Sequence, residues 1–325
     1  MTKRKSTRTP PKEDAQGDFF VPTLWDLSTK DTRSIMDVAI FRLSKKDKRI
    51  GETMRYELPD GFVEVSSGVA GMASVWDYDL VLMAVSHMTE AMNRFRDGKG
   101  LKPERVFKPH VSDILKFCRR ADGGKQKNDL VETCMRLSTT HVAVERKKKD
   151  GRTISEGETL ISRYKVIHNK AGNPEHLEIE MSDWMYREIT EGENPDVLTV
   201  HPDYFLIDPG IARFVYRLAR RSAGKDRAKW AFSTIYERSG STGPLKKFNF
   251  NLRKLIEIND LPEYHLSENK GLKGSPMLMI NHRETLQSIL PLESPKKSIK
   301  KTLTDKQATR KAISEAIMDI QDTDW

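Results

Sequence analysis

The helical order of this chain is set by residues 208–258, DPGIARFVYRLARRSAGKDRAKWAFSTIYERSGSTGPLKKFNFNLRKLIEI. The stretch opens with Asp208 and Pro209, residue types that are favoured just before a helix and at its first position. Apolar residues then recur at the helical period in three segments, 209–223, 228–239 and 244–256. The stretch therefore predicts three helices separated by short turns.

Two short extended pieces follow these helices, near 263–267 and 277–281, and the same order of elements occurs earlier in the chain. The earlier helices are expected from Asp77, from Pro109 and over 125–137, and alternating apolar and polar residues follow over 141–146, 160–167 and 177–181. Helix, helix, tight turn, helix and hairpin is the order of a winged helix-turn-helix. We therefore predict an α+β fold of two tandem winged helix-turn-helix units, mainly helical with short antiparallel β-hairpin wings.

This order divides the chain into four expected segments. They are a disordered basic N-terminal arm over 1–30, a first winged-helix unit over 31–195, a second winged-helix unit over 196–290, and a polar basic tail over 291–325 with one short helix near 305–319. Turn-forming residues predict loops over 149–157 and 169–174. Each unit is long enough to bury a core without disulfides.

The charge of the chain is strongly segregated along the sequence. The 325 residues carry a formal net charge of +9. Residues 211–254 hold 12 Lys and Arg against two acids, whereas residues 172–208 hold one Arg against ten acids. The tail over 296–311 holds seven bases against one acid. A basic surface of this kind favours an acidic partner, and we expect double-stranded DNA to bind the second unit.

The third helix of the second unit has the composition of a helix that reads the major groove. Arg and Lys bond guanine edges, Asn bonds adenine, and neighbouring cations approach phosphates. A solvated helix face is the alternative interpretation, but this run is almost free of acids. The residues that we expect to read or approach bases are Lys246, Lys247, Asn249, Asn251, Arg253 and Lys254.

A second basic stripe is expected on the helix over 209–223, because its arginines recur at helical spacing opposite the apolar face. The turn before the third helix can also donate backbone N–H groups to a phosphate. The expected phosphate contacts are Arg213, Arg217, Arg220, Arg221, Lys225, Lys229, Ser241 and Thr242.

The first unit is less suited to reading a groove. Its third helix, over 125–137, carries a net charge of only +1, which favours a role in dimerisation or in contact with the DNA backbone. The loop that follows is either a wing that touches phosphate or an exposed basic turn. Its residues are Arg146, Lys147, Lys148, Lys149 and Arg152.

Motifs of DNA-processing enzymes are missing from the sequence. No two of the eight histidines are separated by a single residue, as a rolling-circle initiator would need, and there is no G-x-x-x-x-G-K-[ST] phosphate loop. Asp77 and Asp79 resemble paired metal-binding acids, but acids are common at a helix start because of the helix dipole. Cys118 and Cys134 fall on apolar stripes and are expected to be buried thiols. We therefore expect no catalytic residue, no metal, no cofactor and no small-molecule substrate.

Six phrases of the sequence carry a family resemblance. They are GMASVWDYDL at 71–80, LEIEMSDWMY at 177–186, LTVHPDYFLID at 198–208, RFVYRLARRSAGK at 213–225, SGSTGPLKKF at 239–248 and NDLPEY at 259–264. Together they resemble the plasmid replication initiator protein A family of alphaproteobacteria, over roughly residues 35–285. The resemblance implies a cytoplasmic initiator that binds repeated sites in a plasmid origin and recruits host replication machinery. Iteron-binding initiators are similar in plan, with a first winged-helix unit for dimerisation and a second for DNA reading.

The sequence thus predicts a non-enzymatic plasmid replication initiator that binds repeated double-stranded DNA sites sequence-specifically. We expect a homodimer in the bacterial cytoplasm, with a host initiator or the replicative helicase as protein partner. The alternative is a winged-helix transcriptional repressor that binds one palindromic operator as a dimer. A third class, an interaction adaptor without DNA contact, predicts no salt-dependent affinity for DNA.

No membrane association is expected. The longest apolar run, 80–85, is far shorter than the roughly 20 residues of a membrane span. The basic N-terminal residues lack the apolar segment of a secretory signal. Both features favour a cytoplasmic location.

Overall fold

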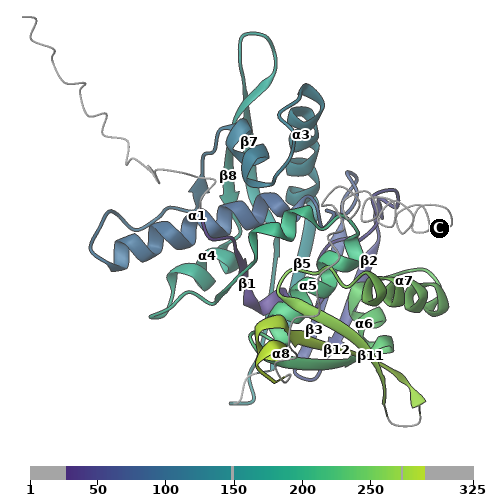
Figure 1. The fold of residues 1–325 in the computed structure, drawn as a ribbon. Coiled ribbons are helices and arrows are strands. Elements are labelled where there is room, and N and C mark those ends of the chain that lie inside the picture. Colours follow the sequence, from purple (N-terminus) through teal and green to yellow (C-terminus); the bar gives the residue numbers. More distant parts are fainter. Residues whose placement is uncertain (1–26, 148–149, 272–273, 290–325) are drawn as a thin grey trace, which may run out of the picture.

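The computed structural model describes residues 27–147, 150–271 and 274–289. Most of the expected arm over 1–30, Lys148, Lys149 and the tail with its expected helix therefore lie outside the described residues. Within these ranges the fold is a mixed α/β arrangement whose sheets are antiparallel (Figure 1).

The first half of the chain is organised around a long helix, α1, which is buried from Tyr78 to Thr89 because other elements surround it (Figure 1). The main elements of this half are α1 (Tyr78–Arg96), β4 (Val106–Phe107), α2 (Val111–Phe117), α3 (Gly124–Thr139), β7 (Ile161–His168) and β8 (Pro174–Met181). Its three strands form a sheet in the order β4-β8-β7. The three helices that the sequence predicts in this half are confirmed.

The second half has the same order of helices and strands. Its elements are α5 (Gly210–Ser222), β10 (Arg227–Ala231), α6 (Phe232–Ser239), α7 (Leu245–Ile258), β11 (Tyr264–Lys270), β12 (Pro276–His282) and α8 (Arg283–Ile289). The sheet order is β10-β12-β11. In both halves, the strand between the first two helices therefore pairs with the second strand of the final hairpin.

One helix of the second half is shorter than the sequence predicts. The apolar spacing predicts a helix over 228–239, but residues 227–231 form β10 and α6 begins at Phe232. The strand forms because β10 pairs with β12, for example Trp230 with Leu278. Tertiary pairing here overrides the local helical spacing.

Two hairpins that the sequence does not fully predict form a four-stranded sheet. Its strands are β2 (Thr53–Leu58), β3 (Gly61–Ser67), β5 (Thr140–Lys147) and β6 (Thr153–Thr159), in the order β2-β3-β5-β6. The predicted strand over 141–146 lies within β5, but the predicted loop over 149–157 is largely β6. β6 lacks a sequence signal because it has no buried residue and hence no apolar alternation.

Short elements join the two halves. β1 (Lys30–Thr32) pairs with β9 (Val197–Thr199), which ties the start of the described chain to the segment before α5. The remaining elements are η1 (Arg33–Ile35), α4 (Asp183–Thr190) and η2 (Pro202–Leu206). The sequence patterns do not predict these short elements.

One hydrophobic core runs through both halves. It includes Val81 of α1 together with Phe214 of α5 and Leu252 of α7. Cys118 and Cys134 are buried, as expected, and burial raises the pKa of both thiols to about 12. Among the described residues, no helix combines the length and the apolar character needed to cross a membrane.

Candidate nucleic-acid interface

Helix α7 has one face in the core and one face in solvent. Phe248 and Leu252 are buried against neighbouring elements that include α6 and β11. Lys246, Phe250 and Arg253 are exposed, at the i, i+4 and i+7 positions of one face. Phe250 is 47% exposed on this face, and its spacing from Lys246 is the sequence signal that predicts this position.

The six predicted base-reading residues differ in how far the structure exposes them to solvent. The exposed ones are Lys246 and Arg253, and the half-buried ones are Lys247, Asn249 and Lys254. Asn251 is only 5% exposed and lines a small pocket between α7 and neighbouring segments, so the prediction that it reads a base is wrong. The reason is helical geometry, because Asn251 follows the buried Phe248 by three residues and precedes the buried Leu255 by four.

Arg253 is held by an acid of the neighbouring hairpin. Its Nε donates to one carboxylate oxygen of Glu268 at 2.9 Å, and its Nη2 donates to the other at 2.8 Å. The Arg253 guanidinium also lies 5.5 Å from the centre of the Phe232 ring. The hydrogen bonds of this pair lower the pKa of Glu268 and raise the pKa of Arg253. Both groups are therefore charged at neutral pH.

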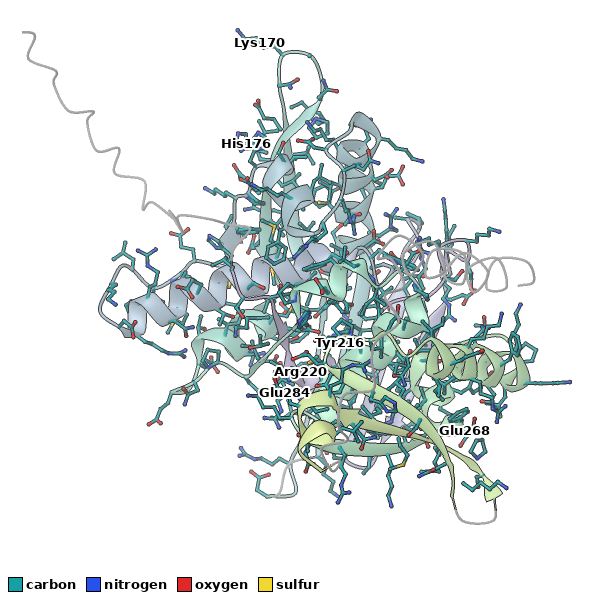
Figure 2. The ribbon with its side chains drawn as sticks, in the orientation of Figure 1. Lys170, His176, Tyr216, Arg220, Glu268 and Glu284 are labelled. Carbon is teal, nitrogen blue, oxygen red and sulfur yellow. The ribbon has the colours of Figure 1, made fainter. Side chains whose placement is uncertain are left out.

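The end of α7 fixes the hairpin beside the helix. Asn259 has a φ of 49°, the left-handed conformation that commonly follows the last turn of a helix. Its Nδ2 donates to the carbonyl of Leu266, and its Oδ1 accepts from the N–H of Leu266, both at 2.9 Å. Leu266 precedes Glu268 by two residues in β11, so these bonds position Glu268 relative to Arg253. Figure 2 shows Glu268 on the part of the hairpin next to α7.

Two of the predicted phosphate contacts are buried instead. Arg213 is 3% exposed and its Nη1 donates to Asp79 at 2.6 Å. Arg217 is fully buried and its Nε donates to Asp31 at 2.6 Å. The prediction that these two arginines hold phosphates is wrong. The side of α5 that carries them, which the sequence predicts to face solvent, packs against α1 and β1 instead.

The other predicted phosphate contacts reach the surface. Lys225, Lys229 and Thr242 are exposed, and Arg220, Arg221 and Ser241 are half-buried. Arg220 Nε donates to the carbonyl of Thr199 at 2.5 Å, which directs this cation toward β9. Contact of these residues with DNA stays a prediction.

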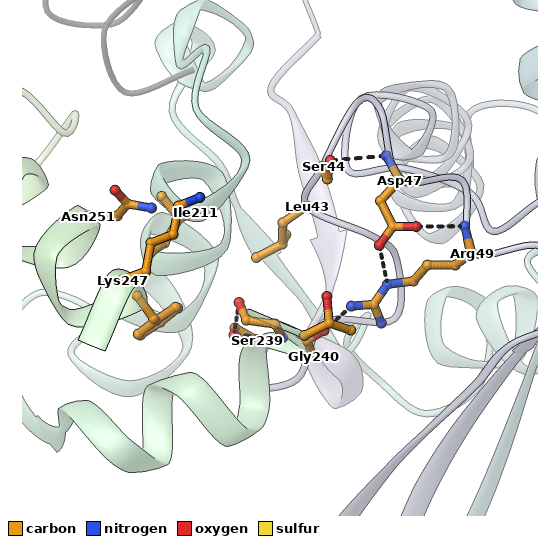
Figure 3. Close-up of a pocket in the computed structure, with 12 residues that line it drawn as sticks. Leu43, Ser44, Asp47, Arg49, Ile211, Ser239, Gly240, Lys247 and Asn251 are labelled. Carbon is orange, nitrogen blue, oxygen red and sulfur yellow. Dashed lines mark hydrogen bonds and ion pairs between the residues drawn. The ribbon is translucent and has the colours of Figure 1, made fainter. Parts of the chain in front are cut away.

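A basic loop that no sequence motif marks lies beside the start of α7. Residues 44–49 read SKKDKR, and its exposed lysines are Lys45, Lys46 and Lys48. The buried Arg49 donates to the carbonyl of Gly240 in the α6–α7 turn. Between loop and helix lies a cavity of about 50 Å³, lined by residues that include Arg49, Lys247 and Asn251 (Figure 3). This space holds a few water molecules.

Hydrogen bonds hold this basic loop in one shape. The Ser44 Oγ accepts from the N–H of Asp47 at 3.2 Å, and the Asp47 Oδ1 accepts from the N–H of Arg49 at 3.2 Å. The carbonyl of Lys48 accepts from the N–H of Met72 at 2.8 Å. The loop therefore presents its exposed lysines from a fixed backbone.

The basic β5–β6 hairpin of the first half is engaged with acids where it is described. Arg146 pairs with Asp60 at 2.9 Å, and Arg152 pairs with Asp150 at 2.7 Å. Lys147 is exposed. By topology, the hairpin that corresponds to β11–β12 is β7–β8 rather than β5–β6. Contact of the β5–β6 hairpin with DNA stays a prediction.

The two acids at the start of α1 are paired with arginines. Asp77 accepts from Arg136 at 2.8 and 2.9 Å, and Asp79 accepts from Arg120 at 2.9 Å and from Arg213. Across the ranges that the structure describes, no three His, Cys, Asp or Glu side chains are grouped to hold a metal ion. These acids therefore stabilise the packing of α1.

Known proteins resemble this chain in sequence and in fold. The sequence profile of the family described as Replication initiator protein A matches residues 30–266. A protein of Wigglesworthia glossinidia brevipalpis, named "Putative replication protein", is 27% identical over 241 residues, which cover 72% of this chain and 82% of that protein. The crystal structure of domains 2 and 3 of RctB superposes with a TM-score of 0.53 at 13% identity, over 77% of this chain and 98% of that chain. The likeness to RctB concerns the fold.

Proposed function

The chain belongs to the replication initiator protein A family, and from that premise we propose that it is a plasmid replication initiator that binds repeated double-stranded DNA sites in an origin sequence-specifically. In this proposal the two halves are tandem winged helix-turn-helix units, and α7 is the recognition helix of the second. The protein acts without catalysis, as a cytoplasmic homodimer that recruits a host initiator or the replicative helicase.

The observation that carries the proposal is the outward face of α7 beside an antiparallel hairpin. This face presents Lys246 and Arg253 to solvent, and Asn259 fixes the hairpin next to it. In helix-turn-helix proteins the second helix of the motif, here α7 after α6, lies in the major groove with its first residues near base edges. Arg and Lys are the residues that bond guanine there.

Cations around α7 would hold the DNA backbone. Arg213 and Arg217 are buried, so we do not assign them to phosphates. We assign the exposed Lys46 and Lys48 of the basic loop instead. The proposed phosphate contacts are Lys46, Lys48, Arg220, Arg221, Lys225, Lys229, Ser241 and Thr242.

Footprinting on the DNA that flanks the gene, together with plasmid maintenance, tests the proposal. We expect protection of an array of direct repeats beside an AT-rich stretch, and maintenance of an origin-bearing plasmid in a strain that supplies only this gene. Protection of a single palindrome without plasmid maintenance would identify a transcriptional repressor instead. The absence of any salt-dependent binding to these duplexes would refute a DNA-binding role altogether.

A further inference from the structure

The pair of Arg253 and Glu268 lies where the outward face of α7 meets the β11–β12 hairpin. The Arg253 side chain is 50% exposed and that of Glu268 is 34% exposed, so a ligand can reach the pair from outside. The contact is made along one side of the guanidinium, because Nε and Nη2 bond the two oxygens of the carboxylate.

This geometry leaves the end of the guanidinium available. A guanidinium has five N–H donors, and the contact with Glu268 uses the Nε hydrogen and one Nη2 hydrogen. The hydrogens that remain, on Nη1 and Nη2, include the two parallel N–H bonds at the tip of the side chain. Two parallel donors of this kind match the N7 and O6 acceptors of guanine in the major groove.

A phosphate fits this arginine less well than a base does. The Glu268 carboxylate lies within 3 Å of the guanidinium nitrogens. It neutralises the positive charge of Arg253 and repels an approaching anion. A guanine edge is uncharged and offers two acceptors, so it meets no such repulsion. The acid therefore disfavours the DNA backbone as a ligand of Arg253 while favouring a base.

Several contacts hold the pair in place before DNA arrives. The bonds between Asn259 and Leu266 fix the hairpin to α7, and the Phe232 ring lies beneath the Arg253 guanidinium. An arginine that is already ordered loses less side-chain entropy on binding. Its direction is also less variable, which increases discrimination between bases.

We propose that Arg253 recognises a guanine and that Glu268 is the positioning residue that presents the free end of its guanidinium to that base. The proposal rests on the proposed function, because it requires α7 to lie in the major groove. It adds the chemical identity of one recognised base and a specificity role for an acid on the hairpin.

Selection of bound duplexes from a random-sequence library tests the proposal. The proteins are the wild-type chain, R253A, E268A, E268Q, and E284Q as a control that removes one exposed acid from α8 in the same half, away from the hairpin tip (Figure 2). We expect one guanine position in the wild-type site to lose preference in both R253A and E268A, with discrimination falling by roughly 5- to 150-fold. E268Q, which keeps one acceptor, retains part of the preference, and E284Q retains all of it.

A second measurement uses a modified base. It detects the contact between Arg253 and the guanine itself, which a purely structural role for Glu268 would not affect. Replacement of that guanine by 7-deazaguanine removes N7 and should weaken binding of the wild-type chain but not of R253A. If E268A discriminates for that guanine as strongly as the wild-type chain does, Glu268 does not position Arg253, and the proposal fails while the proposed function stands. If the wild-type chain selects no sequence at all, the two fail together.

Discussion

Single residues show that a stripe of arginines on a helix can be an interior feature. Arg217 lies 4.8 Å from the centres of both the Phe41 and Tyr78 rings, and its charge is balanced by Asp31, which is 186 positions away in sequence. Among the described residues, none accepts a hydrogen bond from its Nη1 or Nη2. The pairing acid is distant along the chain, so helical spacing alone cannot distinguish this arrangement from a DNA-facing stripe.

Removal of this buried cation should destabilise the fold. We expect Arg217→Met to lower the free energy of unfolding by about 3–5 kcal/mol, because Asp31 is left buried and unpaired. The double variant D31N/R217M should recover part of this loss. Urea denaturation followed by circular dichroism measures both, and R221M serves as the control on the same helix. A loss in R217M no larger than that in R221M would contradict the account.

Glu188 on α4 is half-buried, and its Oε2 atom is buried without a hydrogen-bond partner among the residues that the structure describes. Its pKa is raised to about 7, mainly because burial disfavours the charged form; the neighbouring Ser34 hydroxyl lowers the pKa, the charges of Asp196 and Asp31 raise it, and the charge of Arg187 lowers it. Because the folded-state pKa is the higher one, the stabilising contribution is complete only below the ordinary pKa of a glutamate. It is lost as the pH rises to 7.

This shift predicts a pH-dependent effect of one substitution. Glu188→Gln should stabilise the protein by about 2–3 kcal/mol at pH 8, where the wild-type chain must bury a carboxylate, and by almost nothing near pH 4. Thermal unfolding across this range measures the difference, with the exposed Glu191→Gln as the control. A stabilisation that is the same at both pH values would show that Glu188 is not the titrating group.

At the scale of elements, long amphipathic helices are predictable from sequence and short or exposed strands are not. α1, α3, α5 and α7 have apolar stripes that specify them locally. β10 is a strand because β12 pairs with it, and β6 has no buried residue to mark it. These outcomes depend on partners that are distant in sequence, which local periodicity does not contain.

Some parts of the candidate site are likewise predictable from the sequence and others are not. The outward positions of Lys246 and Arg253 follow from helical spacing, whereas Glu268 and the basic loop over 44–49 are found only through tertiary contacts. Arg49 of the loop meets Gly240 across 191 positions of sequence. No pattern within either segment indicates that they are neighbours.

The basic loop should contribute to DNA affinity without affecting sequence preference. Lys48→Gln is expected to lower the slope of the logarithm of affinity against the logarithm of salt concentration by about one unit, because one phosphate contact is lost. The ranking of DNA sequences should not change. Lys99→Gln, just beyond the end of α1 that points away from α7, is the matched control (Figure 1). Identical slopes for K48Q and the wild-type chain would remove the loop from the interface.

At the scale of the whole molecule, buried charges and a shared core join the two halves. Arg213 and Arg217 of α5 pair with Asp79 of α1 and Asp31 of β1. The hydrophobic core contains residues of both halves in one cluster. These buried ion pairs and the shared hydrophobic core therefore fix the orientation of α7 relative to the first half.

This joining predicts cooperative unfolding. We expect calorimetry to show a single transition whose calorimetric and van't Hoff enthalpies agree, because the described residues of both halves share one hydrophobic core. The variant D79N, which leaves Arg213 without its acid, should lower the midpoint of this transition. Two resolved transitions in the wild-type chain would mean that the halves fold independently.

The central claim, sequence-specific DNA binding through the outward face of α7, is tested most directly by fluorescence anisotropy at one fixed salt concentration. The ligands are a duplex that carries one origin repeat and a scrambled duplex of the same composition. The account predicts that the wild-type chain prefers the repeat by at least about 1,000-fold, and that K246Q/R253Q loses most of this preference while unfolding at the same midpoint. Equal affinity of the wild-type chain for both duplexes, or an undiminished preference in the double variant, would contradict it.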